Sequence, residues 1–266
     1  MSRAKSTGAA AFDRATFCRP IAHRGLHGTP GGGAVENTLP AFRAAIAHGY
    51  GIECDLRPGK GGLPLVFHDE TLDRLVAGSG EVARLDQRDI AGLAFKGDPA
   101  ARIPTFAALC ELVAARVPML VEIKSEWAPP DGAFLAAVAA IAASYRGALA
   151  LMSFDPAVMT VLRELAPQVP RGIVSGNYLR AGDGDDHWWP DKLDRARAER
   201  LTHLLESGPV EPSFYSYDVR ALPTPVTRYV RDVQGLPIFT WTVRTADDLA
   251  TTAACADAPT FEGFLA

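Results

Sequence analysis

The chain has 266 residues, of which 48% are hydrophobic and 22% are charged, with a formal net charge of −4. This composition is ordinary for a globular protein, and the lack of a basic tract argues against a nucleic-acid partner. The sequence has no uncharged apolar run of about 20 residues and no apolar stretch typical of a signal peptide, so we expect a cytoplasmic protein without stable membrane insertion.

Short apolar segments alternate with helical patterns along the chain, which is typical of parallel βαβ units. In chain order, the expected strands are residues 20–24, 51–56, 119–124, 149–154, 171–175, 214–217, 238–243 and 260–264. Eight parallel strands can close into a barrel, and such barrels take about 250 residues. We therefore predict an α/β fold, a (β/α)8 TIM barrel that forms one domain over residues 1–266. The pattern alone also fits an open, doubly wound sheet.

Helices are expected where an N-cap residue precedes apolar residues at helical spacing. Two of the caps are followed by a proline that suits the first helical turn. The expected caps are Thr38, Thr105, Asp131, Asp155, Thr224 and Thr245. Gly235 suits the end of the helix that follows Thr224, and His48 falls at the end of the helix that follows Thr38.

Two stretches interrupt this alternation. Residues 69–104 are too long for a plain loop, and we predict that they form a small inserted segment on one rim, after the second strand. Residues 176–191 are expected to form an irregular loop. The four cysteines, Cys18, Cys54, Cys110 and Cys255, are widely spaced and are expected to be thiols rather than a disulfide framework.

Charged side chains occur inside two of the apolar strands. Glu53 and Asp55 are two residues apart, so they share one face of their strand while Cys54 faces the other way, and Glu122 and Lys124 share a face likewise. Three carboxylates that converge at one barrel end repel each other unless a cation lies among them. Oxygen ligands suit Mg²⁺ or Ca²⁺. The spacing alone fits equally well an internal Glu–Lys salt bridge beside a surface aspartate.

Two histidines lie at expected strand ends. His23 follows the first strand in Ile-Ala-His-Arg-Gly, and His68 lies in Leu-Val-Phe-His-Asp. Histidine exchanges protons near neutral pH, and phosphodiester cleavage needs a base for the attacking hydroxyl and an acid for the leaving alkoxide. Arg24, Lys124 and a metal ion could supply positive charge to the phosphate oxygens.

These residues lie in an ordered set of motifs that resembles the glycerophosphodiester phosphodiesterase family. The motifs are His23-Arg24-Gly25, Glu36-Asn37-Thr38, Glu53-Cys54-Asp55, His68-Asp69 and Glu122-Ile123-Lys124, followed by Ser153-Phe154 and Trp241-Thr242-Val243. Each motif is common alone, but five in this order and spacing are specific. The resemblance covers residues 20–125 strongly and the remainder weakly.

The resemblance implies a barrel with an insertion after its second strand. It implies Glu53, Asp55 and Glu122 as ligands of a divalent cation, and His23 and His68 as general acid and base in an order that stays open. Further implied roles concern the substrate: Arg24 and Lys124 contact the phosphate, Glu36 lies by the metal or orients Arg24, and Trp241 either contacts glycerol or packs in the core.

Some segments depart from the motifs of the family, and the roles of some residues stay open. The final strand carries Thr-Phe-Glu-Gly-Phe, which leaves the role of Glu262 undecided, and residues 30–33 add a glycine-rich loop near His23. Trp188 and Trp189 form either a lid that selects the alcohol or a cover for an apolar rim. His27 is expected to make no substrate contact, and Phe154 is expected in the core.

The resemblance predicts a metal-dependent enzyme that hydrolyses small glycerophosphodiesters, such as glycerophosphocholine or glycerophosphoethanolamine, to glycerol 3-phosphate and an alcohol. A lysophospholipase D or phosphoinositide-type lipase would use the same chemistry but would need an exposed apolar rim. A non-catalytic barrel that binds phosphodiesters is a third hypothesis, against which the presence of both histidines argues. The sequence does not indicate an oligomeric state.

Overall fold

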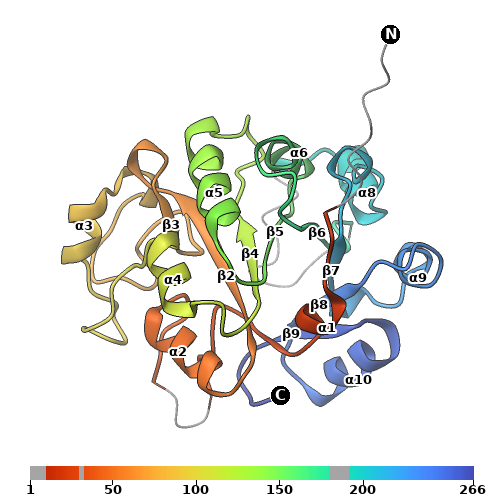
Figure 1. Ribbon diagram of the computed structural model, residues 1–266, viewed down its shortest axis with the longest axis horizontal. Helices are drawn as coiled ribbons and strands as arrows, with labels where there is room; N and C mark the ends of the chain where they lie inside the picture. The colour runs from red at the N-terminus through yellow and green to blue at the C-terminus, as the bar shows by residue number, and fades with distance from the viewer. Residues whose placement is uncertain (1–9, 30–32, 180–191) are drawn as a thin grey trace.

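The computed structural model describes residues 10–29, 33–179 and 192–266 (Figure 1). In this part of the chain, eight parallel strands follow one another in sequence order, and the last pairs with the first. The strands are β1 (Ile21–Ala22), β2 (Gly51–Pro58), β4 (Met119–Ile123), β5 (Leu149–Ser153), β6 (Arg171–Ser175), β7 (Phe214–Asp218), β8 (Ile238–Val243) and β9 (Ala258–Phe261). The predicted TIM barrel is confirmed, and the open sheet is excluded.

Most predicted strand bounds agree with the structure to within two residues, but the last strand was predicted at 260–264 and lies at Ala258–Phe261. Pro259, near the start of this strand, has no N–H to donate to a neighbouring strand. In the barrel, Pro259 nevertheless lies in register with Thr240 of β8. The first strand is shorter than predicted because the backbone turns at Arg24 and Gly25, which both have positive φ.

Helices surround the barrel, as the ribbon of Figure 1 shows. All six predicted N-caps are confirmed, and in five of them the side chain accepts a hydrogen bond from a backbone N–H of the first turn. The α-helices are α1 (Arg14–Phe17), α2 (Leu39–Ala47), α3 (Gln87–Gly92), α4 (Phe106–Val113), α5 (Gly132–Ser144), α6 (Pro156–Leu165), α8 (Arg195–Thr202), α9 (Pro225–Arg228) and α10 (Ala246–Cys255). A π-helical turn at Tyr229–Val233 extends α9 and ends before Gly235.

Strand β2 is longer than its neighbours and continues into a hairpin that was not predicted from the sequence. The chain reverses through a 3-10 turn at Lys60–Gly62 and returns as β3 (Pro64–Val66), antiparallel to β2. The backbone N–H of Phe67 then donates to the carbonyl oxygen of Asp55 at 3.0 Å. This hairpin brings His68 back to the carboxyl end of the barrel.

The segment between β3 and α4 overlaps the predicted insertion at 69–104. It carries α3, which lies at the edge of the molecule outside the helices that cover the barrel (Figure 1). Its apolar residues pack with Leu65 of β3 into a small separate core, which also contains Phe67, Leu72, Val76, Val82, Ile90, Phe95, Ala101 and Ile103. Whether residues 1–266 form one domain stays a prediction.

The two faces of the barrel strands have different partners. Outward residues such as Cys54 and Val121 pack beneath the helices, and all four cysteines are free thiols, as predicted. Inward residues fill the lower barrel, and this inner core consists of Phe17, Ile21, Leu120, Ala150, Met152, Val174, Phe214, Phe239 and Ala258. Because side chains alternate along a strand, the next inward positions after Ile21 and Leu120 are His23 and Glu122. His23 and Glu122 therefore lie directly above this packed inner core.

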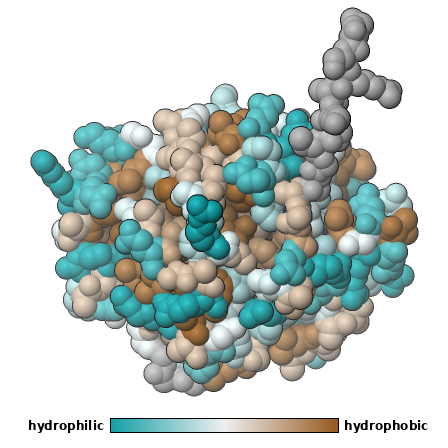
Figure 2. Space-filling view, in the orientation of Figure 1, coloured by the Kyte–Doolittle hydropathy of each residue, from teal (hydrophilic) through white to brown (hydrophobic). Residues whose placement is uncertain are grey.

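Hydrophilic and hydrophobic side chains are interspersed over the face of the molecule seen in Figure 2. The large exposed hydrophobic residues of the described part of the chain are Leu165, Leu179, Leu205, Tyr229, Val233 and Leu265. Most of them lie on separate elements. Among the described residues, none of the helices combines the length and apolar character that a bilayer crossing requires.

Candidate active site

The turn after β1 positions the first functional residues. Arg24 adopts a φ of 54° and Gly25 a φ of 80°, and a Cβ atom on Gly25 would lie 2.9 Å from the Cβ of Ala41 in α2. Glycine therefore allows this turn to pack closely against α2. The backbone N–H of Arg24 donates to Glu53 Oε2 at 3.0 Å, which ties the turn to β2.

Three carboxylates converge above the inner core of the barrel. Glu53 and Asp55 lie on β2 and Glu122 on β4, all three are buried, and one oxygen from each lies within 4.8 Å of the others. Burial, followed by the charges of Asp55 and Glu122, raises the pKa of Glu53 well above its usual range. Burial also raises the pKa of Glu122, although Lys124 opposes the shift. The charged forms of Glu53 and Glu122 are therefore disfavoured by their surroundings, and a cation among the three carboxylates would favour them.

Asp55 is the best-paired carboxylate of the three. Its oxygens lie 2.9 Å from Lys124 Nζ and 3.2 Å from Arg24 Nε, and Asn37 Nδ2 donates to Oδ2 at 2.8 Å. Burial alone would raise the pKa of Asp55, but Lys124 and Arg24 hold it well below its usual range. The alternative of a surface aspartate is wrong, whereas the predicted Glu122–Lys124 ion pair is present at 2.6 Å.

The cluster could hold a metal ion. Oxygen Oε1 of Glu53 is buried and has no hydrogen-bond partner among the described residues, and such a charged atom is costly unless a cation compensates it. The donor set consists of carboxylate oxygens, which suits a hard divalent cation. The residues therefore fit the predicted metal, and its identity is not established.

His68 enters the site from the chain that follows β3. Its Nδ1 lies 2.7 Å from Asp69 Oδ1, and Arg74 contacts both oxygens of Asp69. Burial, followed by the charge of Lys124, lowers the pKa of His68 to about 4. Its ring is therefore neutral at pH 7 and able to accept a proton.

Arg74 also links this side of the site to the first turn. Its guanidinium donates to both oxygens of Glu36, and Glu36 Oε1 accepts from Arg24 Nη1 at 2.8 Å. Burial would raise the pKa of Glu36, but Arg74 and Arg24 lower it to about 2. Of the two roles open for Glu36, the structure places it on Arg24 rather than among the three carboxylates.

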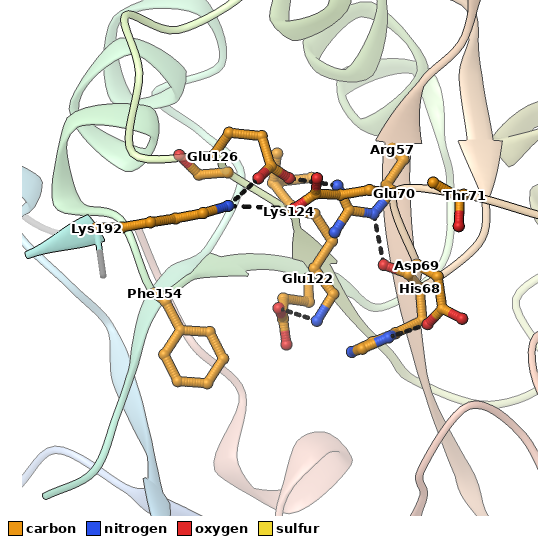
Figure 3. A pocket seen from close by; sticks show the side chains of 12 residues that line it. Arg57, His68, Asp69, Glu70, Thr71, Glu122, Lys124, Glu126, Phe154 and Lys192 are labelled. Carbon is orange, nitrogen blue, oxygen red and sulfur yellow. Dashed lines mark hydrogen bonds and ion pairs between the residues drawn. The ribbon is translucent and has the colours of Figure 1, made fainter. Parts of the chain in front are cut away.

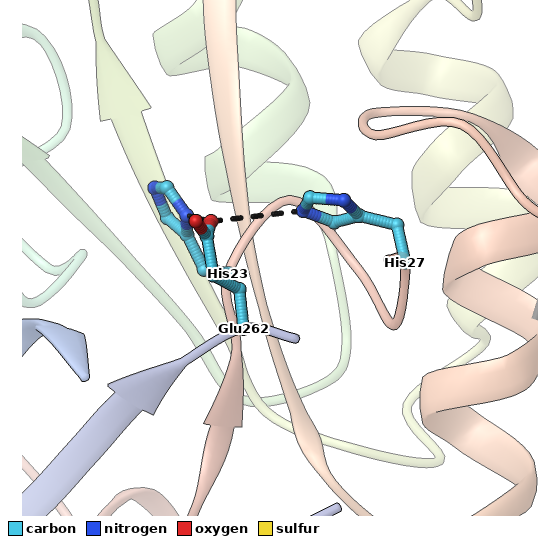
Figure 4. Close-up of side chains that lie close together, drawn as sticks. All are labelled: His23, His27 and Glu262. Atoms are coloured by element: carbon cyan, nitrogen blue, oxygen red, sulfur yellow. Dashed lines mark hydrogen bonds and ion pairs between the residues drawn. The ribbon is translucent and has the colours of Figure 1, made fainter. Parts of the chain in front are cut away.

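His23 extends from the end of β1 into the same space. Its Nε2 lies 3.9 Å from Glu53 Oε2, and its Nδ1 lies 2.5 Å from Glu262 Oε2, just beyond β9. Burial, followed by the charge of Arg24, lowers the pKa of His23. Figure 4 shows Glu262 between the rings of His23 and His27, and His27 Nε2 lies 3.8 Å from the same oxygen.

A cavity of about 290 Å³ opens beside His68, Glu122 and Lys124. Figure 3 shows Phe154 and His68 on opposite sides of it, and Lys192 and Arg57 reaching toward Glu126 from either side. Arg57 Nη1 lies 2.5 Å from Glu126, and Lys192 pairs with Glu126 and with Glu70. The lining residues are Arg57, His68, Asp69, Glu70, Thr71, Glu122, Ile123, Lys124, Ser125, Glu126, Phe154 and Lys192.

The comparison with family models decides what kind of protein carries this site. Residues 23–256 match the glycerophosphoryl diester phosphodiesterase family. The chain belongs to this family.

Individual relatives agree with that assignment. A glycerophosphodiester phosphodiesterase of Caldanaerobacter subterraneus is 31% identical over 165 residues, which cover 58% of this chain and 65% of the relative. Glycerophosphodiester phosphodiesterase 1 of Bos taurus is 26% identical over 251 residues, which cover 86% of this chain and 72% of the relative. The match to the bacterial relative thus spans about two thirds of that protein's length.

The fold also resembles solved structures. A phosphodiesterase of Oleispira antarctica, in complex with the product sn-glycerol-3-phosphate, superposes with a TM-score of 0.69 at 20% identity. The superposition covers 91% of this chain and 92% of that one. At this identity the likeness supports the barrel fold of the glycerophosphoryl diester phosphodiesterase family.

The structure brings the predicted site residues together at one end of the barrel, with two qualifications. Trp241 lies outside the charged cluster and, among the predicted site residues, only His68, Glu122 and Lys124 line the cavity. The indole of Trp241 packs edge-on against Phe154 at 5.2 Å, and its Nε1 donates to the carbonyl oxygen of Ser175. Phe154, expected only in the core, lines the cavity as well as packing there. His48 is the C-cap of α2, as expected, and His203 is exposed at the end of α8.

Several residues of the site were not assigned roles from the sequence. Asn37 stood inside a quoted motif, and its position beside Asp55 depends on a φ of 56° that the sequence does not reveal. Arg74 lies in residues 69–104, and Lys192 follows directly after residues 176–191. In these two irregular stretches, hydrophobic periodicity does not predict which side chains reach the site. Trp188, Trp189, His187 and residues 30–32 lie outside the described residues.

Proposed function

We propose that this chain is a metal-dependent phosphodiesterase that hydrolyses glycerophosphodiesters, such as glycerophosphocholine or glycerophosphoethanolamine, to glycerol 3-phosphate and an alcohol. The observation that carries the proposal is the cluster of three buried carboxylates at one end of the barrel, with His23 Nε2 3.9 Å from Glu53 Oε2 and with His68 and Glu122 lining the adjoining cavity. Family membership supports this chemistry. The glycerol 3-phosphate bound to the Oleispira antarctica phosphodiesterase is the same product that we propose here.

Two proton transfers make up the proposed role of the histidines. One ring accepts the proton of the attacking hydroxyl as its oxygen bonds to phosphorus, and the other ring donates a proton to the oxygen whose bond to phosphorus breaks. His23 and His68 approach the carboxylate cluster from different strands, so each could serve one of these oxygens. A bound phosphodiester anion favours the protonated form of a neighbouring imidazole and so assists the acid.

Positive charge for the phosphate comes from side chains of the same cluster. Lys124 has three N–H donors and uses contacts to Asp55 and Glu122, which leaves one for a phosphate oxygen. Arg24 directs its guanidinium into the cluster and is held there by Glu36. Glu53, Asp55 and Glu122 would hold Mg²⁺ or Ca²⁺, which when bound supplies Lewis-acid stabilisation of charge on phosphate oxygens.

The cavity supports a small, polar substrate. Its lining includes the charged side chains Arg57, Glu70, Glu126 and Lys192, and an apolar group placed against them would remove their solvent at a cost in free energy. Phe154 offers an aromatic surface in the same cavity. We propose that one half of the diester occupies this cavity, with Trp241 supporting Phe154 from behind.

The lysophospholipase D alternative has one observation in its favour. A second cavity of about 410 Å³ adjoins the first and shares Arg57 and Glu126 with it. The remainder of its lining includes the apolar residues Val82, Ala83, Ala128, Pro129, Pro130, Phe134, Leu135 and Val158. The lining that the two cavities share is largely polar and charged, which disfavours an acyl chain there, so we propose deacylated diesters as the principal substrates.

The test is turnover by the purified protein with a divalent cation present. We expect release of glycerol 3-phosphate from glycerophosphocholine or glycerophosphoethanolamine, and slower turnover of lysophosphatidylcholine. His68→Ala should lower kcat by about 10²–10⁴-fold, because a positioned acid or base contributes that much. His48→Ala, at the exposed end of α2, is the control and should leave kcat unchanged. Wild-type protein that binds but never cleaves these diesters would favour the non-catalytic barrel.

A further inference from the structure

Glu262 takes no part in the proposed proton transfers, although it lies next to a proposed catalytic group. It is the residue after β9, and its side chain is 19% exposed. Its Oε2 lies 2.5 Å from His23 Nδ1, and its Oε1 accepts from Arg244 Nε at 2.6 Å. Burial would raise the pKa of Glu262, but His23 and Arg244 lower it, so the carboxylate is charged at neutral pH.

The two ring nitrogens of His23 have different surroundings. Nδ1 contacts Glu262, whereas Nε2 is directed toward Glu53 and the carboxylate cluster. A neutral imidazole carries one N–H, and a carboxylate can only accept a hydrogen bond, so the proton belongs on Nδ1. The lone pair of Nε2 then faces the space in which the phosphate reacts.

The second histidine has the same arrangement from an unrelated part of the chain. His68 Nδ1 contacts Asp69, and Arg74 holds Asp69, just as Arg244 holds Glu262. Asp69 is the next residue after its histidine, whereas Glu262 is separated from His23 by 239 residues. Two arginine–carboxylate–histidine chains therefore converge on one cluster.

We propose that Glu262 is the positioning residue of His23: it fixes the tautomer with the proton on Nδ1 and holds the ring so that Nε2 exchanges protons with the substrate. Glu262 acts through His23 and does not touch the substrate. The catalytic consequence rests on the proposed function, while the tautomer does not.

The kinetic test is a double-mutant cycle with glycerophosphocholine. Glu262→Ala should lower kcat by about 10-fold or more, while KM changes less than about two-fold. The expected loss is smaller than the 10²–10⁴-fold that a general acid or base contributes, because His23 itself remains. In a His23→Ala background the same substitution should change kcat less than about two-fold, because its target is gone. A loss that persists undiminished in that background would overturn the proposal.

Glu206→Ala is the matched control for this cycle. Glu206 is 21% exposed and pairs with Arg200 and Arg197, so its burial and partners resemble those of Glu262, but it lies beyond the end of α8. We expect its kcat to equal that of wild type. Thermal unfolding of each variant shows that the chain is folded under assay conditions.

The second test reads the tautomer directly and needs no turnover. Proteins labelled with ¹⁵N-histidine are compared by long-range ¹H–¹⁵N spectra with Mg²⁺ present, and the His23 signals are identified by their loss in His23→Ala. We expect the Nδ1–H tautomer in wild type and a population of the Nε2–H tautomer in Glu262→Ala. An unchanged tautomer would contradict the proposal, whether or not the protein hydrolyses glycerophosphodiesters.

A rival role for the same residues is metal binding, because His23, His27 and Glu262 each offer an atom within 4.8 Å of the others. Metal analysis of the purified proteins separates the two roles. A positioning role predicts the same number of bound ions in wild type and Glu262→Ala. Loss of one ion in that variant would make Glu262 a ligand and overturn the proposal.

Discussion

Asp55 illustrates how single residues make a buried charge tolerable. It is 1% exposed, yet Lys124, Arg24 and Asn37 all contact its oxygens. Asn37 also accepts a hydrogen bond from the backbone N–H of Asp55 at 3.3 Å. A buried carboxylate that loses such a neutral donor is left with an unsatisfied lone pair, which is costly in the protein interior.

We therefore expect Asn37→Ala to lower the free energy of unfolding by about 2–3 kcal/mol, since it removes both hydrogen bonds and places alanine at a positive φ. Urea denaturation measures the effect. Asn177→Ala is the control, because Asn177 is exposed and should change stability by less than about 0.5 kcal/mol. Equal stabilities of the two variants would show that Asn37 does not support Asp55.

At the scale of single residues, the sequence predicted which residues belong to the candidate site better than it predicted the contacts between them. Alternation placed Glu53 with Asp55 and Glu122 with Lys124 on common strand faces, and His23 and His68 were predicted from their positions at expected strand ends and from the family resemblance. Further partners were not predicted, since Arg74 reaches Asp69 from a turn and Glu262 reaches His23 from beyond a strand end, where the geometry has no periodic signature. The Trp241 contact with substrate stays a prediction.

Among the elements, the β2–β3 hairpin determines where His68 lies. Gly62 in its turn has a φ of 81°, and a Cβ atom there would lie 2.7 Å from the backbone nitrogen of Phe134 in α5. Gly61 has a similar φ of 69° but faces open space. Of these two glycines, only Gly62 lies close against α5. A shift of the turn at Gly62 would move β3 and, with it, His68.

We expect Gly62→Ala to destabilise the protein by about 2–3 kcal/mol and to lower kcat, whereas Gly61→Ala should cost about 1 kcal/mol and leave kcat within about two-fold. Both variants place alanine at a positive φ, so the difference between them reports the contact with α5. Denaturation and glycerophosphocholine turnover are the measurements. Matching kcat values for the two variants would mean that the hairpin does not position His68.

At the scale of the whole molecule, the alternation of strands and helices indicated parallel βαβ units, but it also fitted an open sheet. The choice of a closed barrel rested on the count of eight strands and on the family resemblance. A strand end was expected at His68, but the bounds of β3 and its antiparallel pairing with β2 were not predicted, since a three-residue strand carries little pattern. The last strand begins two residues earlier than predicted, with Pro259 in register with Thr240 although proline has no N–H to donate. Both errors lie where the chain departs from the repeating unit.

Closure of the barrel brings the residues of the candidate active site together. β1 pairs with β2 on one side and with β9 on the other, so His23, Glu53 and Glu262 meet although they are far apart in sequence. β4 pairs with β2 in the register Asp55 to Glu122, which completes the three carboxylates. The proposed metal site therefore exists only in the folded barrel.

The most direct test of the proposed metal site is a calorimetric titration of chelator-treated protein with Mg²⁺ and with Ca²⁺. We expect wild type to bind one ion of at least one of these metals in the carboxylate cluster. Glu53→Gln, which keeps the size of the side chain but removes its charge, should lose that ion while remaining folded. Binding that is unchanged in Glu53→Gln, or a wild-type protein that binds neither cation, would contradict the claim that the three carboxylates form one metal site.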